Sequence, residues 1–188
     1  MIPEWNMAGL LPPIYPGESG ASPVRSPYKT DLHQIANRLA QTPERKAILQ
    51  GFLLFRDDLR KLGIERGFQW LDGSYLEKVE DIESRPPRDI DVVTFFYLPE
   101  KESQDSLIVK YPNLFDPENS KKTYSVDAYF HILGKPIEEY DVRQIAYWYS
   151  MWSHRRDKAW KGFIQVELSS SDDKISIEKL DIIQQSGV

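Results

Sequence analysis

Two neighbouring stretches decide the fold of this chain: Phe68-Gln-Trp-Leu-Asp-Gly-Ser74, followed by Arg88-Asp-Ile-Asp-Val-Val-Thr-Phe-Phe96. The first is a strand-like run that ends in a Gly-Ser turn, and the second is a strand-like run that opens with Asp89 and Asp91. Strand side chains alternate between the two faces of a sheet, so both carboxylates are predicted to point the same way. Close like charges repel each other unless a cation lies between them, and Mg²⁺ prefers carboxylate oxygens as ligands. The two stretches therefore predict neighbouring strands with a metal-binding pair of aspartates.

The turn formed by Gly73 and Ser74 extends this pattern, because glycine lets a phosphate group approach the backbone amides closely. Ser74 has two possible roles, capping a following helix or binding a phosphate with its hydroxyl and amide. Taken alone, each motif has an ordinary explanation: Gly-Ser is common in turns, and charged residues protect strand edges from aggregation. Their combination predicts a site for a nucleoside triphosphate and its metal ion.

A Gly-Ser turn followed by Asp-x-Asp on the next strand resembles the DNA polymerase β-like nucleotidyltransferase superfamily, over roughly residues 68–132. The flanking segments resemble a bacterial family that shares this core. The resemblance implies a third carboxylate on a later strand, and Tyr124-Ser-Val-Asp-Ala-Tyr-Phe-His-Ile132 offers Asp127. It further implies a Mg²⁺-dependent transfer of a nucleoside monophosphate from a nucleoside triphosphate to a hydroxyl of RNA or protein. Two Mg²⁺ ions would be held by the three catalytic carboxylates Asp89, Asp91 and Asp127.

The resemblance also carries a biological setting, since small bacterial members act in toxin–antitoxin or phage-defence pairs. The chain departs from the compact family pattern in residues 75–83, which lengthen the path from Ser74 to the aspartate pair. The acids of this segment would repel a triphosphate unless they face away from it.

Cations for the phosphates are sought between Arg143 and Lys161, a stretch that holds five Lys or Arg residues and one acid, Asp157. We expect Arg155 and Lys161 to bind the nucleotide together with the Gly-Ser turn, because cationic groups strengthen phosphate binding as water is excluded. The alternative is a solvated turn that follows a helix.

Composition sets the class of protein. The 188 residues suit one domain with its own core. The absence of cysteine excludes disulfides and thiolate zinc sites and fits a reducing cytoplasm. The net charge of −5 argues against bulk affinity for nucleic acid. We see no secretory leader and no apolar run long enough to span a membrane, so no membrane partner is expected.

The predicted fold is α+β, a nucleotidyltransferase-like mixed β-sheet flanked by helices in a single domain over residues 30–188. Residues 1–29 hold six of the thirteen prolines and are expected to form an extended arm packed on that domain through apolar anchors. The expected helices are residues 30–39, 43–62 and 137–152, residues 75–83 are expected to be a short helix or a loop, and the expected strands are 68–72, 89–98, 123–133 and 163–168. Residues 99–120 are expected to be a loop with a short helix, and 169–188 a weakly amphipathic tail.

The rival hypothesis is a catalytically silent nucleotidyltransferase-like binding module, for instance an antitoxin or defence subunit that acts on a partner protein through its surface. The two hypotheses differ in whether Asp89, Asp91 and Asp127 converge. Neither the nucleotide nor the acceptor is fixed by the sequence.

Overall fold

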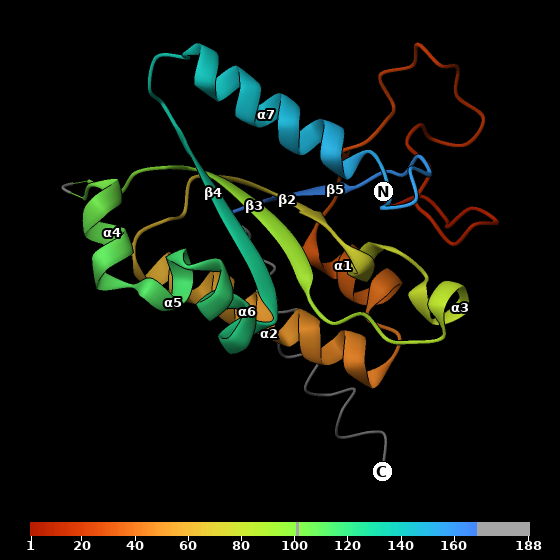
Figure 1. Cartoon of the computed structure of the whole chain (residues 1–188), viewed down its shortest axis with the longest axis horizontal. Coiled ribbons are helices and arrows are strands. Elements are labelled where there is room, and N and C mark those ends of the chain that lie inside the picture. The colour runs from red at the N-terminus through yellow and green to blue at the C-terminus, as the bar shows by residue number, and fades with distance from the viewer. Residues whose placement is uncertain (101, 169–188) are drawn as a thin grey trace.

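A computed structural model describes residues 1–100 and 102–168, and in this part of the chain five strands form one mixed sheet with helices on both of its faces (Figure 1). The strand order across the sheet is β1 (Tyr28–Lys29), β5 (Ile164–Glu167), β2 (Gly67–Asp72), β3 (Ile90–Tyr97) and β4 (Val126–Leu133). β1 and β5 run parallel, as do β3 and β4, whereas β2 is antiparallel to both of its neighbours. The predicted α+β class, a mixed sheet flanked by helices, is confirmed.

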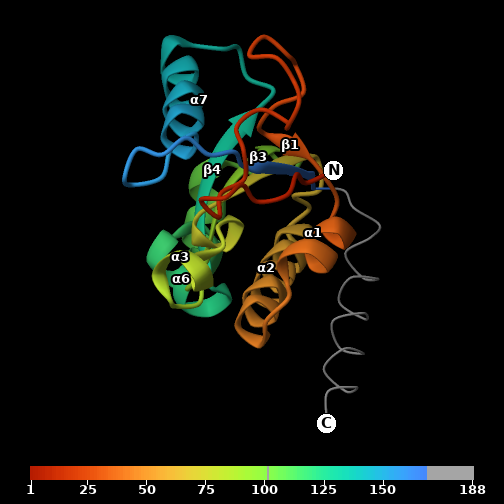
Figure 2. The ribbon, with the colours of Figure 1, turned by 90° about the vertical axis from the view of Figure 1, so that its right-hand side faces the viewer.

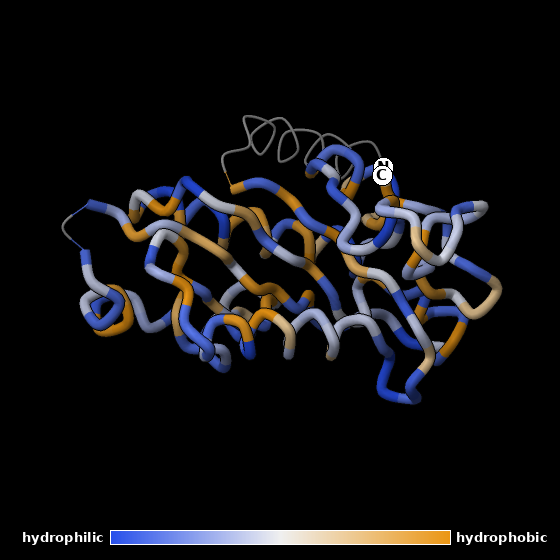
Figure 3. Tube along the Cα trace, turned by 90° about the horizontal axis from the view of Figure 1, so that it is seen from above, coloured by the Kyte–Doolittle hydropathy of each residue, from blue (hydrophilic) through white to orange (hydrophobic). Residues whose placement is uncertain are grey.

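Helices α1 (Leu32–Leu39), α2 (Pro43–Lys61) and α6 (Pro117–Tyr124) cover one face of the sheet, and α7 (Glu139–Trp152) crosses the other (Figures 1 and 2). Helices α1 and α2 both begin with a side-chain cap: Asp31 accepts a hydrogen bond from the amide of Gln34, and Thr42 accepts one from the amide of Arg45. The buried face of α2 repeats at helical spacing and includes Ile48, Phe52, Phe55 and Leu59. Hydrophobic residues accordingly follow the strands through the middle of the molecule (Figure 3).

The stretch expected to be a loop with one short helix is instead three helices: α4 (Gln104–Lys110), α5 (Pro112–Phe115) and α6. The Pro and Asn residues that suggested a loop stand in the first turns of helices. Proline is tolerated there because a backbone amide in the first turn has no partner within the helix. Ser103 caps α4 and Asp116 caps α6. Because α6 continues to Tyr124, the strand predicted from residue 123 begins at Val126.

Residues 1–29 lie against the sheet and against the loop that follows β2. Leu10 and Leu11 are buried, and the carbonyl of Leu11 accepts a 2.7 Å hydrogen bond from the amide of Gly162. The indole of Trp5 donates a 2.7 Å hydrogen bond to the carbonyl of Leu76. β1, which the sequence did not predict, ends this segment and pairs with β5.

The insertion after the Gly-Ser turn forms a short 3₁₀ helix, η1 (Ser74–Leu76), and helix α3 (Val79–Glu83). A buried guanidinium, that of Arg45, fixes the whole insertion to α2. It donates to the Glu80 carboxylate at 2.6 Å and to the carbonyls of Tyr75 and Glu77 at 2.7 and 2.5 Å. A buried charge is tolerated when it is paired in this way, so Arg45 sets where residues 75–83 lie relative to the strands.

The amphipathic tail expected at 169–188 lies outside the described residues. Among the helices that the structure describes, none combines the length and the apolar character needed to cross a membrane.

Candidate functional site

Three aspartates form a row across one end of three neighbouring strands. In the strand register Asp72 of β2 lies opposite Asp91 of β3, and Asp91 lies opposite Asp127 of β4. Directly opposed residues on neighbouring strands point to the same face, so all three carboxylates share the face that α7 crosses further along. Two of the three predicted carboxylates are therefore immediate neighbours. Asp72 was not predicted as a site residue, although it stands directly before Gly73 as the last residue of the expected strand 68–72.

The third predicted carboxylate, that of Asp89, lies near the row because the Lys121 ammonium contacts both Asp89 and Asp127. β3 begins at Ile90, so Asp89 precedes the strand rather than opening it. The ammonium of Lys121, on the last turn of α6, lies 2.8 Å from Oδ2 of Asp89 and 3.2 Å from Oδ2 of Asp127. The structure thus brings Asp89, Asp91 and Asp127 to one place, with a positive charge between two of them. Lys121 was not predicted as a site residue, because residues 99–120, where α6 begins, were expected to be a loop with a short helix.

Asp91 stands in the centre of this group of acids. Burial and the charges of Asp89 and Asp127 together raise the pKa of its carboxyl to about 6, against the opposing pull of Lys161 and Lys121. The row therefore holds more negative charge than its own lysines balance. Perturbation of this kind, by burial and like charges together, is typical of functional sites.

Position 73 requires glycine because of its backbone conformation and because of the close approach of Asp91. Its φ of +86° lies in the region that glycine adopts without strain. A Cβ built at this position would stand 2.7 Å from Oδ2 of Asp91. The predicted turn therefore packs directly on the predicted carboxylate, and Ser74 begins η1 beside this contact.

Lys161 is buried beside the same row but is already paired. Its ammonium lies 2.9 Å from Oδ1 of Asp72 and 3.0 Å from Oε1 of Glu77. Burial raises the pKa of Asp72 to about 7, although Lys161 opposes the shift. Burial would lower the pKa of Lys161, yet Asp72 and Glu77 together raise it. Lys161 thus holds the strand end next to the Gly-Ser turn in place.

Arg155 is engaged in the same manner. Its guanidinium contacts Oε1 of Glu83 at 2.6 Å and Oε2 of Glu77 at 3.6 Å. The acids of residues 75–83 were expected to repel a triphosphate. In the structure, Glu77 and Glu83 instead pair with Arg155 and Lys161, the two cations expected to bind phosphate. Arg155 and Lys161 lie near the carboxylate row, and their role in nucleotide binding stays a prediction.

The carboxylates of Asp89, Asp91 and Asp127 suit a divalent cation if the Lys121 side chain moves away from them. Within residues 1–100 and 102–168, no group of three or more His, Cys, Asp or Glu side chains is arranged to hold a metal ion as it stands. The Lys121 ammonium occupies the position between Asp89 and Asp127, and its side chain is 48% exposed, so it can turn into solvent. Two aspartate oxygens that already converge on one positive charge, beside a third aspartate, offer the hard ligands that Mg²⁺ prefers.

A comparison with known protein families matches most of the chain. Residues 3–167 match the model of a family described as a family of unknown function, DUF6932, and the chain belongs to that family. No curated protein and no solved structure matches the chain.

Proposed function

We propose that the protein is a Mg²⁺-dependent nucleotidyltransferase that moves a nucleoside monophosphate from a nucleoside triphosphate to a hydroxyl of RNA or protein. The observation that carries the proposal is the gathering of Asp89, Asp91 and Asp127 around the Gly73 turn. Such a cluster costs folding free energy through burial and repulsion, as the raised pKa of Asp91 indicates. A cluster with this cost is expected where the carboxylates serve a reaction that depends on a bound cation.

In this proposal Asp89, Asp91 and Asp127 hold two Mg²⁺ ions once Lys121 has turned away. The metal would supply charge neutralisation for the triphosphate and polarise the acceptor hydroxyl. Gly73 and Ser74 would hold the phosphates through backbone amides and the Ser74 hydroxyl, in line with the acceptor. Asp127 would accept the proton of the acceptor hydroxyl. The acceptor oxygen bonds to the α-phosphorus, the bond from that phosphorus to the bridging oxygen breaks, and pyrophosphate leaves with the electron pair.

After Lys121 turns away from the aspartates, its ammonium is the most exposed cation beside them. It would then be free to contact the triphosphate, a role expected from the sequence for Arg155 and Lys161. Those two residues would act instead by fixing residues 75–83 and the end of β2, unless nucleotide binding draws them from Glu77 and Glu83.

A second candidate is a catalytically silent nucleotidyltransferase-like binding module, such as an antitoxin or defence subunit. The observation that favours it is that Lys121, Arg155 and Lys161 are all paired with acids. A module that no longer binds metal would be stabilised by a permanent lysine at the cation position.

The experiment is label transfer from each of the four α-³²P-labelled nucleoside triphosphates, with MgCl₂, to total tRNA and to the protein itself. Asp91→Asn and Asp127→Asn are the test variants, and Asp105→Asn is the matched control because Asp105 is exposed on α4. We expect Mg²⁺-dependent transfer that both test variants lose and the control keeps. Equal transfer by Asp91→Asn and the wild type would reject this site as the source of the activity. An absence of both transfer and Mg²⁺ binding by the wild type would reject the enzyme in favour of the silent module.

A further inference from the structure

β4 is the edge strand of the sheet that the structure describes. Within residues 1–100 and 102–168 its only strand partner is β3, with which it pairs over eight residues. The carbonyl of Ser125 accepts from the amide of Ile90 in β3, whereas the carbonyl of Val126 accepts from the Ser120 hydroxyl on α6. Backbone groups alternate in direction along a strand. The amides and carbonyls of Ala128, Phe130 and Ile132 therefore face away from β3.

Those outward groups have no partner within the described part of the chain. No hydrogen bond reaches the backbone of Ala128, Phe130 or Ile132 from any described residue outside the sheet. The edge also lacks the usual protection against strand pairing, because residues 128–133 contain no proline, lysine or other charged residue apart from a histidine. An unpaired strand edge of this kind is a template for another strand.

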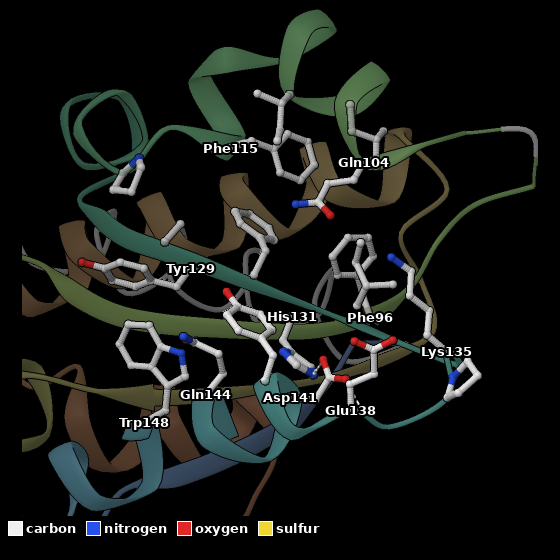
Figure 4. Close-up of a pocket in the computed structure, with 18 residues that line it drawn as sticks. Phe96, Gln104, Phe115, Tyr129, His131, Lys135, Glu138, Asp141, Gln144 and Trp148 are labelled. Carbon is white, nitrogen blue, oxygen red and sulfur yellow. Dashed lines mark hydrogen bonds and ion pairs between the residues drawn. The ribbon is translucent and has the colours of Figure 1, made fainter. Parts of the chain in front are cut away.

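A cavity of about 590 Å³ follows this edge. Its lining includes all five consecutive residues Ala128–Ile132, from both faces of the strand, so it runs along the edge itself (Figure 4). One wall is α7, with Gln144 and Trp148, and the other is formed by α4 and α5, with Gln104 and Phe115. On each wall an aromatic side chain of β4 packs against one of a helix. The ring centroids of Tyr129 and Trp148 on α7 lie 4.5 Å apart, and those of Phe130 and Phe115 on α5 lie 4.6 Å apart.

The walls decide which occupant fits. A second copy of this chain would present the same edge between the same two helical walls, and its helices would meet those walls before the strands could pair. A single extended segment can enter the groove and use the outward amides and carbonyls. We propose that the groove along β4 binds an extended peptide as a sixth strand of the sheet. This binding requires no nucleotide and so goes beyond the proposed function.

The lining also indicates the chemistry of the peptide. Successive side chains of an added strand would point alternately to the Tyr129–Trp148 wall and to the Phe115–Phe130 wall, and both walls favour apolar or aromatic residues. In the part of the groove beside His131, the acids Glu138 and Asp141 line the cavity together with Lys135, and Oδ1 of Asp141 lies 3.7 Å from Nε2 of His131. The two carboxylates there favour a basic residue in that part of the peptide.

The test uses a phage-displayed library of random twelve-residue linear peptides, selected on the full chain and depleted on the Ala128→Pro variant. This substitution removes one outward amide and leaves the β3–β4 ladder intact, because proline is tolerated where its nitrogen faces away from the sheet. The exposed Leu54→Ala variant on α2 is the control. Melting temperature confirms that each variant is folded.

We expect enriched peptides with apolar residues at alternate positions, bound about ten-fold more weakly by Ala128→Pro than by Leu54→Ala or wild type. N-methylation of alternate peptide amides then tests the backbone pairing directly. Methylation in one register should abolish binding, and methylation in the other should leave it unchanged. Equal loss in both registers, failure to enrich any peptide over the variant, or a dimer that Ala128→Pro dissociates would overturn the proposal.

Discussion

The carboxylate of Asp91 packs against the backbone of Gly73, where a Cβ would stand 2.7 Å from its Oδ2. The two residues come from neighbouring antiparallel strands, at the point where β2 ends and β3 begins. A turn without a side chain therefore sets the position of the central aspartate of the row.

Gly73→Ala is expected to destabilise the protein by about 1–3 kcal/mol, because alanine is strained at φ +86° and its Cβ would displace Asp91. Urea denaturation measures the change. Gly20→Ala is the matched control, since no atom lies within 4 Å of the added carbon there. Equal effects of the two substitutions would contradict the contact with Asp91.

Lys121→Met is expected to lower the melting temperature in the absence of metal and to increase the stabilisation by MgCl₂. The variant removes the ammonium that offsets the repulsion between Asp89 and Asp127, and Mg²⁺ no longer has to displace it. Thermal unfolding over a MgCl₂ titration measures both effects, with Lys122→Met, the exposed neighbour, as control. If Lys121→Met and wild type gain the same stability from Mg²⁺, the lysine does not occupy a cation site.

Asp91→Asn is expected to raise the free energy of unfolding at pH 7.5 by about 1–3 kcal/mol without metal. The folded pKa of about 6 lies above the unfolded value of 3.8, so the folded state binds the proton more tightly. This group therefore weakens stability progressively as the pH rises from about 4 to 6, and the full penalty is present above that window. Below pH 4 the variant and the wild type should agree. A uniform difference at every pH would indicate that the substitution acts through packing.

Arg45→Met is expected to cost about 3–5 kcal/mol, because it leaves Glu80 and two carbonyls without their buried partner. Hydrogen exchange should increase most in residues 75–83, the insertion that Arg45 holds. Lys46→Met, one residue further along the same helix, serves as control. Uniform loss of protection along the chain would show that Arg45 stabilises the whole domain rather than this insertion.

Local patterns in the sequence predicted strands β2 to β5 and most helices, because their signals lie within a few residues of each other. The strand-like run after Asp91 is an example. The helices at 104–124 were missed because proline and asparagine serve both loops and helix starts.

The partners of the candidate site were harder to predict, because they come from distant parts of the chain. Lys161 reaches Asp72 across 89 residues and Glu77 across 84. Lys121 depends on a helix that was not expected. The sequence could identify the three aspartates by motif, whereas only the strand register places Asp72 beside them.

The position of β5 has a consequence for synthesis. β5 lies between β1 and β2 in the sheet, yet it is the last of the five described strands to leave the ribosome. Until residue 167 has emerged, β1 and β2 have no common neighbour, and Lys161 cannot neutralise Asp72. Between the synthesis of Asp127 and that of Lys161, the nascent chain therefore holds the row of acids without the lysine that pairs with Asp72. Completion of the sheet and of the carboxylate row is thus a late event in the synthesis of the described part of the chain, because it waits for pairings between residues far apart in sequence.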